Sequence, residues 1–294
     1  MNRCLIGQMG HVALRSSDAQ ASIDVATRML GLRVTGEDAG TTFLSANRNH
    51  HELIYIEDDR NGVDRFGLVA ADEDALDEAR HRVAQAGFPI VADEPIEAGL
   101  GRGFTFVGPD GFVFEIYLDM PQSVEPALGF GPDRYGHINL HAADIVGMRD
   151  FLVGVLGFMV SDVIGDGELY FLRCNAEHHG IALGKGRGVM HHHAWQAQSI
   201  VELGKLNDRL DAARRRALWG PVRHGAGHNI ATYFAEPGGS VVELYTDMEH
   251  IYDPHRPANT WPTEDGRWYN RWGVYIPAEF RDYGIPPITV ARGL

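Results

Sequence analysis

Three stretches from the first half of the chain return in the second half in the same order. The segment GHVALRSSD at 10–18 resembles GHINLHAAD at 136–144, and MLGLRV at 29–34 resembles VLGFMV at 155–160, both at an offset of 126. The apolar stretch that ends at Met120 resembles the one that ends at Met248, and it pairs Glu115 with Glu243 at an offset of 128. Repeated matches in one order indicate a tandem duplication, in which both copies fold as the same supersecondary unit.

Each copy begins with a strand of alternating polarity, followed by a helix. We expect Asp18 and Asp144 to cap these helices at their N-termini and Gly31 and Gly157 to end them. The remaining elements are predicted from period-two alternation, apolar runs and turn residues. They are strands at 42–46, 51–56, 65–71, 168–174, 180–184 and 191–197, helices at 73–87 and 201–217, and a hairpin in each copy that turns at GPDG or EPGG. The predicted unit, a strand, a helix and further strands, occurs twice per copy.

The sequence predicts an α+β protein of tandem duplicated βαβββ modules, with each copy forming an open cup of mixed sheet. The Pro- and Gly-rich stretch DMPQSVEPALGFGPD separates the copies and is typical of a linker. The end of the chain carries many aromatic residues among prolines, so we expect it to pack on the domains or on a subunit interface. The predicted divisions are an N-terminal domain at 1–120, a linker at 121–133, a C-terminal domain at 134–250 and a tail at 251–294.

Charge and cysteine content restrict the possible functions. Forty acidic against 26 basic residues give a formal charge of -14, which disfavours nucleic acid and anionic membrane surfaces as partners. We find neither an apolar run of membrane-spanning length nor a signal-peptide pattern at the N-terminus, so we expect a cytoplasmic protein. Two cysteines are too few for a disulfide framework or a thiolate-rich metal site. A bound metal would therefore have imidazole and carboxylate ligands.

Fifteen histidines are present, and several of them cluster in predicted strands. Residues of equal parity in a strand share a face, so His137 and Asn139 point the same way, and His192 points away from its neighbours His191 and His193. Glu243 lies in an apolar strand, where an inward carboxylate needs a partner. Two imidazoles and one carboxylate on strands are the ligands of a facial triad that leaves coordination positions of non-haem Fe(II) open for substrate and oxygen.

These segments resemble the type I extradiol dioxygenases of the vicinal oxygen chelate superfamily, whose fold is also that of glyoxalase and bleomycin-resistance proteins. The most specific stretch is HGAGHNIATYFAEPGGSVVE at 224–243, with a His, a spaced Tyr, an acidic-Pro-x-Gly turn and a Glu. Thr232 departs from the family, which usually has an aliphatic residue there. GHIN at 136–139, CNAEHHGIAL at 174–183 and MHHHAW at 190–195 match further family segments.

The resemblance implies that Fe(II), with Mn(II) as an alternative, is bound by His137, His192 and Glu243. It implies that His179 is the acid–base group and that His224 and Tyr233 contact the substrate oxygens. The implied reaction is ring cleavage of a catechol next to the diol with both atoms of O2, in aromatic catabolism. The implied product is a hydroxymuconic semialdehyde-type compound, and the family commonly assembles as homo-oligomers. The residues do not determine which catechol is used.

Several assignments have alternatives. His191 or His193 could be the second ligand in place of His192, because a one-residue register shift exchanges the two faces. Glu243 could be half of a structural ion pair. His178 could be the exposed member of the pair that it forms with His179, and His228 could be a solvated loop residue. Tyr233 could be a packing residue without a catalytic role. Asn139 could bond a neighbouring strand in place of binding substrate.

The first copy keeps His11 and Glu115 at ligand-equivalent positions, but an offset of 126 places Phe66 opposite His192. We therefore expect a metal-free N-terminal scaffold. Two other functions share the fold. A glyoxalase- or epimerase-like lyase or isomerase would take ligands from paired modules, whereas all three candidates here lie in the second copy. A ligand-sequestering resistance protein would need neither the metal nor His179.

Overall fold

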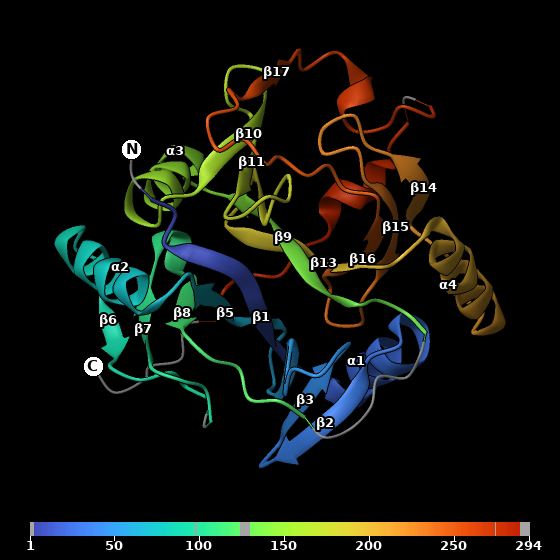
Figure 1. Cartoon of the computed structure of the whole chain (residues 1–294). Coiled ribbons are helices and arrows are strands. Elements are labelled where there is room, and N and C mark those ends of the chain that lie inside the picture. Colours follow the sequence, from blue (N-terminus) through green and yellow to red (C-terminus); the bar gives the residue numbers. More distant parts are fainter. Residues whose placement is uncertain (1–2, 98, 124–129, 274, 289–294) are drawn as a thin grey trace.

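Each repeat folds into one mixed β-sheet in the computed structural model, which describes residues 3–97, 99–123, 130–273 and 275–288 (Figure 1). The predicted linker at 121–133 falls partly on residues 124–129, which lie outside the described residues. The first sheet has eight strands and the second has nine.

The first sheet consists of two βαβββ units that meet at its centre. Strand β1 (Ile6–Ser16) begins one unit and strand β5 (Gly62–Ala70) begins the other, and these two strands pair antiparallel. The strand order is β2-β3-β4-β1-β5-β8-β7-β6. The other elements are α1 (Ala19–Val25) with a π-helical turn (Ala26–Leu30), β2 (Arg33–Asp38), β3 (Thr41–Ser45), β4 (Leu53–Glu57), α2 (Glu73–Gln85), β6 (Ile90–Ala92), β7 (Gly103–Val107), a 3-10 turn (Pro109–Gly111) and β8 (Val113–Tyr117).

The second sheet repeats this plan and gains one strand from the tail. Strands β9 (Arg134–Ala142) and β13 (Val189–Gln196) pair antiparallel at its centre, in the order β14-β15-β16-β13-β9-β12-β11-β10-β17. The other elements are α3 (Ile145–Asp150) with a π-helical turn (Phe151–Val155), β10 (Met159–Ile164), β11 (Leu169–Arg173), β12 (Ile181–Lys185), α4 (Ile200–Ala212), β14 (Trp219–Arg223), β15 (Ile230–Ala235), β16 (Val241–Thr246), β17 (Asn259–Trp261) and 3-10 turns at Gly266–Trp268 and Ala278–Asp282.

This topology confirms the predicted fold of duplicated βαβββ modules. The predicted caps are also present, since the carboxylate of Asp18 accepts from the backbone N–H of Ala21 at 3.1 Å and that of Asp144 accepts from Gly147 at 2.9 Å. The helix predicted at 201–217 was too long. It ends at Ala212 because Arg214 takes a left-handed conformation, with φ of 54°.

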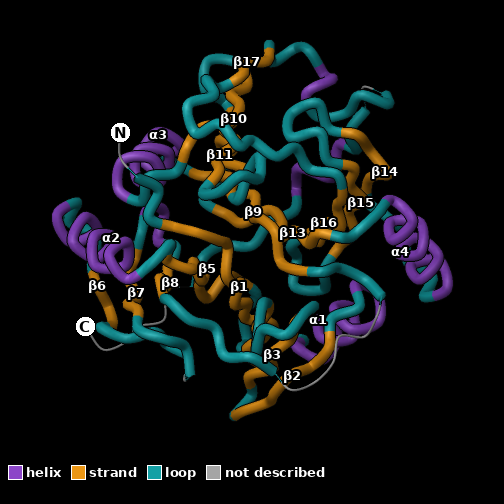
Figure 2. Tube along the Cα trace, in the orientation of Figure 1, coloured by secondary structure: helices purple, strands orange, loops and turns teal. Residues whose placement is uncertain are grey.

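The helices lie at the periphery of the molecule, and the central strands β1, β5, β9 and β13 lie in the middle (Figure 2). The first repeat has many buried phenylalanines. One of them, Phe114, packs against Phe151 of the second repeat, with ring centroids 5.4 Å apart. Each buried side chain of this size contributes about 1.5–3 kcal/mol to folding. Helix α4 also reaches the first repeat, where Arg209 Nε donates to the Met29 carbonyl at 2.8 Å. The two sheets are therefore joined by shared packing.

The tail contacts both sheets. Strand β17 pairs parallel with β10 at the edge of the second sheet. Further along, Val63 of the first sheet donates to the Pro286 carbonyl at 2.8 Å, and Met190 of the second sheet exchanges two backbone hydrogen bonds with Ile285. The tail thus runs from the edge of one sheet to the centres of both. None of the helices in the described part of the chain is long and apolar enough to cross a membrane.

Candidate metal centre and active site

Three adjacent strands of the second sheet carry the predicted metal ligands. Strand β13 lies between β9 and β16, and its Ala194 is opposite His137 on one side and Glu243 on the other. His192 precedes Ala194 by two residues and so shares its face. The small side chain of Ala194 leaves space between the three larger ones. The sheet register therefore brings together residues that are far apart in the sequence.

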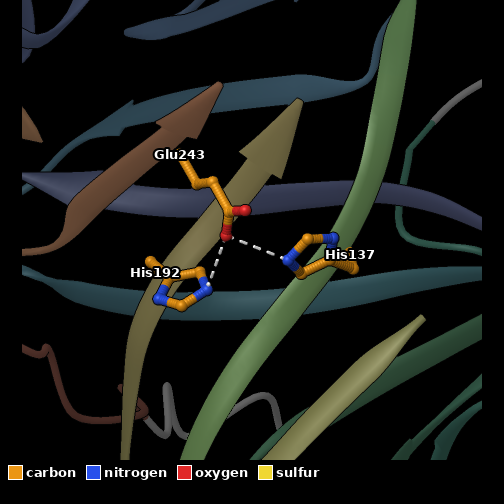
Figure 3. Close-up of side chains that lie close together, drawn as sticks. All are labelled: His137, His192 and Glu243. Carbon is orange, nitrogen blue, oxygen red and sulfur yellow. Dashed lines mark hydrogen bonds and ion pairs between the residues drawn. The ribbon is translucent and has the colours of Figure 1, made fainter. Parts of the chain in front are cut away.

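The three side chains converge on one point (Figure 3). The Nε2 atoms of His137 and His192 each lie 3.1 Å from Oε2 of Glu243, and the possible ligand atoms lie within 4.8 Å of one another. All three residues are buried, with 1%, 5% and 1% exposure respectively. The second carboxylate oxygen, Oε1, accepts a hydrogen bond from Asn229 Nδ2 at 3.0 Å, which leaves Oε2 facing the imidazoles.

The electrostatics at this point fit a divalent cation. Burial alone would raise the pKa of Glu243, but the imidazoles of His137 and His192 beside its carboxylate outweigh it and hold the pKa well below its usual value. Burial lowers the pKa of His192 more than Glu243 raises it, so the imidazole is neutral. Neutral imidazoles and an ionised carboxylate are the protonation states that metal binding requires. This donor set is the two-histidine, one-carboxylate arrangement of non-haem Fe(II) sites.

A cavity of about 510 Å³ opens beside the three residues. Its walls combine polar groups near the candidate ligands with aromatic residues from β14, β15 and the tail. The lining includes His137, Asn139, His179, His192, His224, Tyr233 and Glu243, which are all of the predicted site residues, together with Trp219, Trp268, Tyr269 and Phe280. The volume is large enough for an aromatic ring with a substituent.

His179 lies next to the candidate metal point. Its ring centroid is 4.4 Å from that of His137, and its Nδ1 is 3.0 Å from Nδ1 of His178. Burial, followed by the neighbouring histidines, lowers the pKa of His179 well below its usual value, so the ring is neutral.

The alternative that His178 is the exposed member of its pair is wrong. His178 is fully buried, and its Nε2 lies 3.2 Å from Oδ1 of Asp162 and 4.0 Å from Oε2 of Glu249. A carboxylate from a distant strand makes this burial possible, because a buried imidazole needs a polar partner. Both histidines of the pair therefore point into the protein.

His224 and Tyr233 form a hydrogen-bonded pair on the cavity wall. The carbonyl oxygen of Tyr269 lies 2.6 Å from Nδ1 of His224, and the hydroxyl of Tyr233 lies 2.7 Å from its Nε2. A carbonyl can only accept, so Nδ1 carries the proton and Nε2 accepts from the tyrosine hydroxyl. Burial, followed by the charge of Glu243, raises the pKa of Tyr233 well above its usual value. The phenol therefore remains a donor.

Asn139 and His228 occupy different environments. Asn139 lines the cavity, and its buried Oδ1 has no hydrogen-bond partner among the described residues. His228 is an exposed loop residue with φ of 58°, as expected of a solvated loop histidine.

The first sheet contains a counterpart of this centre. His11 Nε2 lies 3.3 Å from Glu115 Oε1, and Gly67 lies between these two residues as Ala194 does in the second sheet. Counting back two residues from Gly67 places Arg65, and not Phe66, at the position of His192. The prediction of Phe66 was wrong because the offset is 127 in this segment (194 - 67).

Sequence reasoning did not assign the roles that four residues of the site have in the structure. Asn229 donates a hydrogen bond to Glu243, and Nδ1 of His191 lies 2.8 Å from Nδ1 of His192. Tyr269 and Phe280 bring backbone carbonyls to His224 and His191. Asn229 lies inside the family motif at 224–243, which was a signal for the first. Backbone carbonyls carry no residue-specific signal, so the roles of the tail residues could not be read from the sequence.

The sequence model of the Glyoxalase/Bleomycin resistance protein/Dioxygenase superfamily matches residues 8–116 and 134–244. The chain belongs to this superfamily. The two matched segments fall in the two repeats and end one residue beyond Glu115 and Glu243, so the superfamily assignment made from the motif at 224–243 and its companion segments is confirmed.

Among curated relatives, the metapyrocatechase of Geobacillus stearothermophilus is 27% identical over 97% of this chain and 95% of its own length. Among solved structures, the Mn(II)-bound glyoxalase from Novosphingobium aromaticivorans is 30% identical, with a TM-score of 0.85 over 92% of this chain and 91% of that one. Homoprotocatechuate 2,3-dioxygenase from Arthrobacter globiformis has a TM-score of 0.90 at 24% identity, covering 98% of this chain and 94% of that one, and supports the fold.

Proposed function

We propose that this chain is an extradiol dioxygenase, which cleaves a catechol next to its diol and incorporates both atoms of O2. One observation carries the proposal. The imidazoles of His137 and His192 and the carboxylate of Glu243 converge at a cavity of about 510 Å³ whose wall also presents His179, His224 and Tyr233. The name of the full-length relative, a metapyrocatechase, supports the same reaction.

In this proposal His137, His192 and Glu243 hold Fe(II), with Mn(II) as the alternative, since the same ligands accept both. A metal bound there supplies chelation that lowers the pKa of the catechol and a route for electrons between substrate and oxygen. The manganese found in the glyoxalase structure supports the alternative metal.

The pair of His224 and Tyr233 binds the diol oxygens. In the absence of substrate the Tyr269 carbonyl keeps the proton of His224 on Nδ1, and the Tyr233 hydroxyl donates to Nε2. A bound diol would replace that bond, with Nε2 accepting from one substrate hydroxyl and the Tyr233 hydroxyl donating to the other oxygen. One acceptor and one donor side by side distinguish the two oxygens of a catechol and determine which one is deprotonated first. Asn139, with an unpaired buried oxygen, is a third contact to substrate.

His179 is the acid–base group. Burial keeps this imidazole neutral beside His137, so it can accept a proton from the substrate hydroxyl and return it when the ring opens. The expected product is a hydroxymuconic semialdehyde-type compound.

The remaining assignments rest on the same arrangement. Residues 1–120 form a metal-free scaffold, 121–133 a linker, 134–250 the catalytic domain and 251–294 a tail that packs on the domains. The Arg65 guanidinium beside Glu115 supports the metal-free assignment, because it supplies the positive charge there. The partners are a catechol and O2 and not nucleic acid or membrane, the protein acts in the cytoplasm, and copies associate as a homo-oligomer.

Anaerobic reconstitution with Fe(II), followed by oxygen uptake with catechol and with alkyl-, aryl- and carboxyl-substituted catechols, tests the function. We expect one O2 consumed per diol and a yellow product, with no uptake in a metal-free control. An iron-loaded protein that consumes no oxygen with any diol would contradict the proposal.

A glyoxalase-type lyase or isomerase is the second candidate, because the structure 30% identical to this chain carries that name. Its activity needs no oxygen. Turnover of a thiohemiacetal of an α-ketoaldehyde by the metal-loaded protein under anaerobic conditions, together with inert diols in air, would favour it. The acceptor–donor pair of His224 and Tyr233 has no evident role in that reaction.

A further inference from the structure

His191 connects the tail to the candidate ligand His192. Its Nε2 lies 2.6 Å from the backbone carbonyl oxygen of Phe280, and its Nδ1 lies 2.8 Å from Nδ1 of His192. The remaining ring nitrogen of His192, Nε2, is the atom 3.1 Å from Glu243 Oε2. A continuous chain of contacts therefore leads from a tail carbonyl, through two imidazoles, to the point where the metal would lie.

The direction of each hydrogen bond in this chain follows from its first member. A carbonyl oxygen has no proton, so Nε2 of His191 must donate. A neutral imidazole has one N–H, so Nδ1 of His191 has a lone pair and accepts from Nδ1–H of His192. Nε2 of His192 is then left with a lone pair directed at Glu243, which is the tautomer that can bind a metal.

The geometry of His191 is fixed on several sides. It is 1% exposed, so water does not compete for its nitrogens. Its ring lies between those of His141 and Phe280, with centroids at 4.8 and 4.7 Å. The tail is held beside β13 by the two backbone hydrogen bonds between Met190, which precedes His191, and Ile285. The carbonyl of Phe280 is therefore attached next to the imidazole that it orients.

We propose that His191 and the Phe280 carbonyl are positioning groups that fix the tautomer and the ring orientation of His192, which makes the tail part of the metal centre. The inference rests on the proposed metal role of His192. Histidine ligands commonly donate their second N–H to a carbonyl or carboxylate. Here an additional imidazole connects the ligand to a carbonyl of a segment that lies outside the repeats.

Three variants test this proposal. His191→Phe keeps a planar ring but removes the acceptor, whereas His191→Asn keeps an acceptor at the place of Nδ1. His193→Phe is the matched control, because His193 is also buried in β13 and its Nδ1 accepts instead from Trp195 Nε1 at 2.8 Å. Thermal unfolding of the metal-free proteins accounts for any general loss of stability.

The first measurement is the Kd for Fe(II) and Mn(II), by anaerobic chelator competition. We expect His191→Phe to bind roughly 10- to 100-fold more weakly, which is the range for lost partners of metal-bound histidines. His191→Asn should recover most of that loss, and His193→Phe should bind as the wild type does. Equal affinity of His191→Phe and wild type would overturn the proposal, as would an equal loss in His193→Phe or no recovery in His191→Asn.

The second measurement is 15N NMR of the histidine side chains in the wild-type protein loaded with diamagnetic Zn(II). Protons on Nε2 of His191 and Nδ1 of His192 are expected, and a proton on Nδ1 of His191 contradicts the proposal. Neither measurement needs turnover. If the wild type binds metal but cleaves no diol, the proposed function fails and this inference can still hold. If the wild type cleaves catechols while His191→Phe binds metal normally, only this inference fails.

Discussion

The Nε atom of Arg65 lies 3.6 Å from Oε1 of Glu115, in the position that His192 holds beside Glu243 in the other sheet. The guanidinium is 1% exposed and also pairs with Asp64 and Glu97. Burial alone would raise the pKa of Glu115, but the hydrogen bond and charge of His11 and the charge of Arg65 lower it to about 2. A fixed positive charge therefore neutralises the first carboxylate, where a metal is proposed to neutralise the second.

This arrangement predicts a large loss of stability for Arg65→Leu. Removing one partner of a buried ion pair leaves the other charge unpaired, which typically costs about 3–5 kcal/mol. Urea unfolding of the metal-free protein measures the change. Arg60→Leu is the control, because the side chain of Arg60 is 58% exposed and forms surface ion pairs. This variant should shift the midpoint of urea unfolding far less. Similar midpoints for the two variants would show that Arg65 does not neutralise a buried charge.

The assignment of the second ligand predicts a difference between adjacent alanine variants. His192→Ala removes a ligand atom, so iron should be lost on desalting. His191→Ala removes only a neighbour of the ligand, so iron should be retained, with weaker affinity. Iron content after anaerobic reconstitution and gel filtration distinguishes the two. The reverse pattern would move the ligand by one residue.

The repeats made much of the fold and site predictable. Local signals such as the Asp18 and Asp144 caps and the EPGG turn were sufficient to place elements, and strand parity placed His192 and not His191 on the face of Ala194. These features depend on residues close in the sequence, where spacing and side-chain type determine structure.

Other features depend on contacts between distant segments. The offset between the copies is 126 at the first strand, 127 at Arg65 and 128 at Glu115, so a fixed offset misplaced one ligand-equivalent residue. The burial of His178 depends on Asp162 from another strand. The carbonyls of Tyr269 and Phe280 reach the site only through the path of the tail.

Burial of His51 predicts that the protein becomes less stable in mild acid. Its pKa is lowered far below the usual 6.5, mainly by burial and next by His11, so the folded state does not take up this proton while the unfolded chain does below about pH 6.5. Stability should therefore fall as the pH decreases from about 7 towards 4, by up to about 1.4 kcal/mol per pH unit for this group. Urea unfolding at several pH values gives the slope of stability against pH. His51→Phe should reduce that slope by up to about 1.4 kcal/mol per pH unit, which is the contribution of one proton. An unchanged slope would show that His51 is not the group responsible.

The position of His179 beside His137 predicts that its loss reduces the chemical step and spares binding. His179→Ala removes the group proposed to move the proton, and general acid–base groups typically contribute about 10²- to 10⁴-fold to the rate. We expect kcat for catechol cleavage to fall within that range, while KM and iron content stay near the wild-type values because the three metal ligands remain in place. Tyr233→Phe is the comparison. It removes one hydrogen bond, worth about 0.5–1.5 kcal/mol, and should reduce kcat/KM by roughly tenfold or less. Steady-state oxygen uptake measures kcat and KM, and metal analysis of each variant measures its iron content. If His179→Ala raised KM or lost iron while its kcat were preserved, His179 would be a binding or structural residue, and the proton would have to move through His224 or Tyr233.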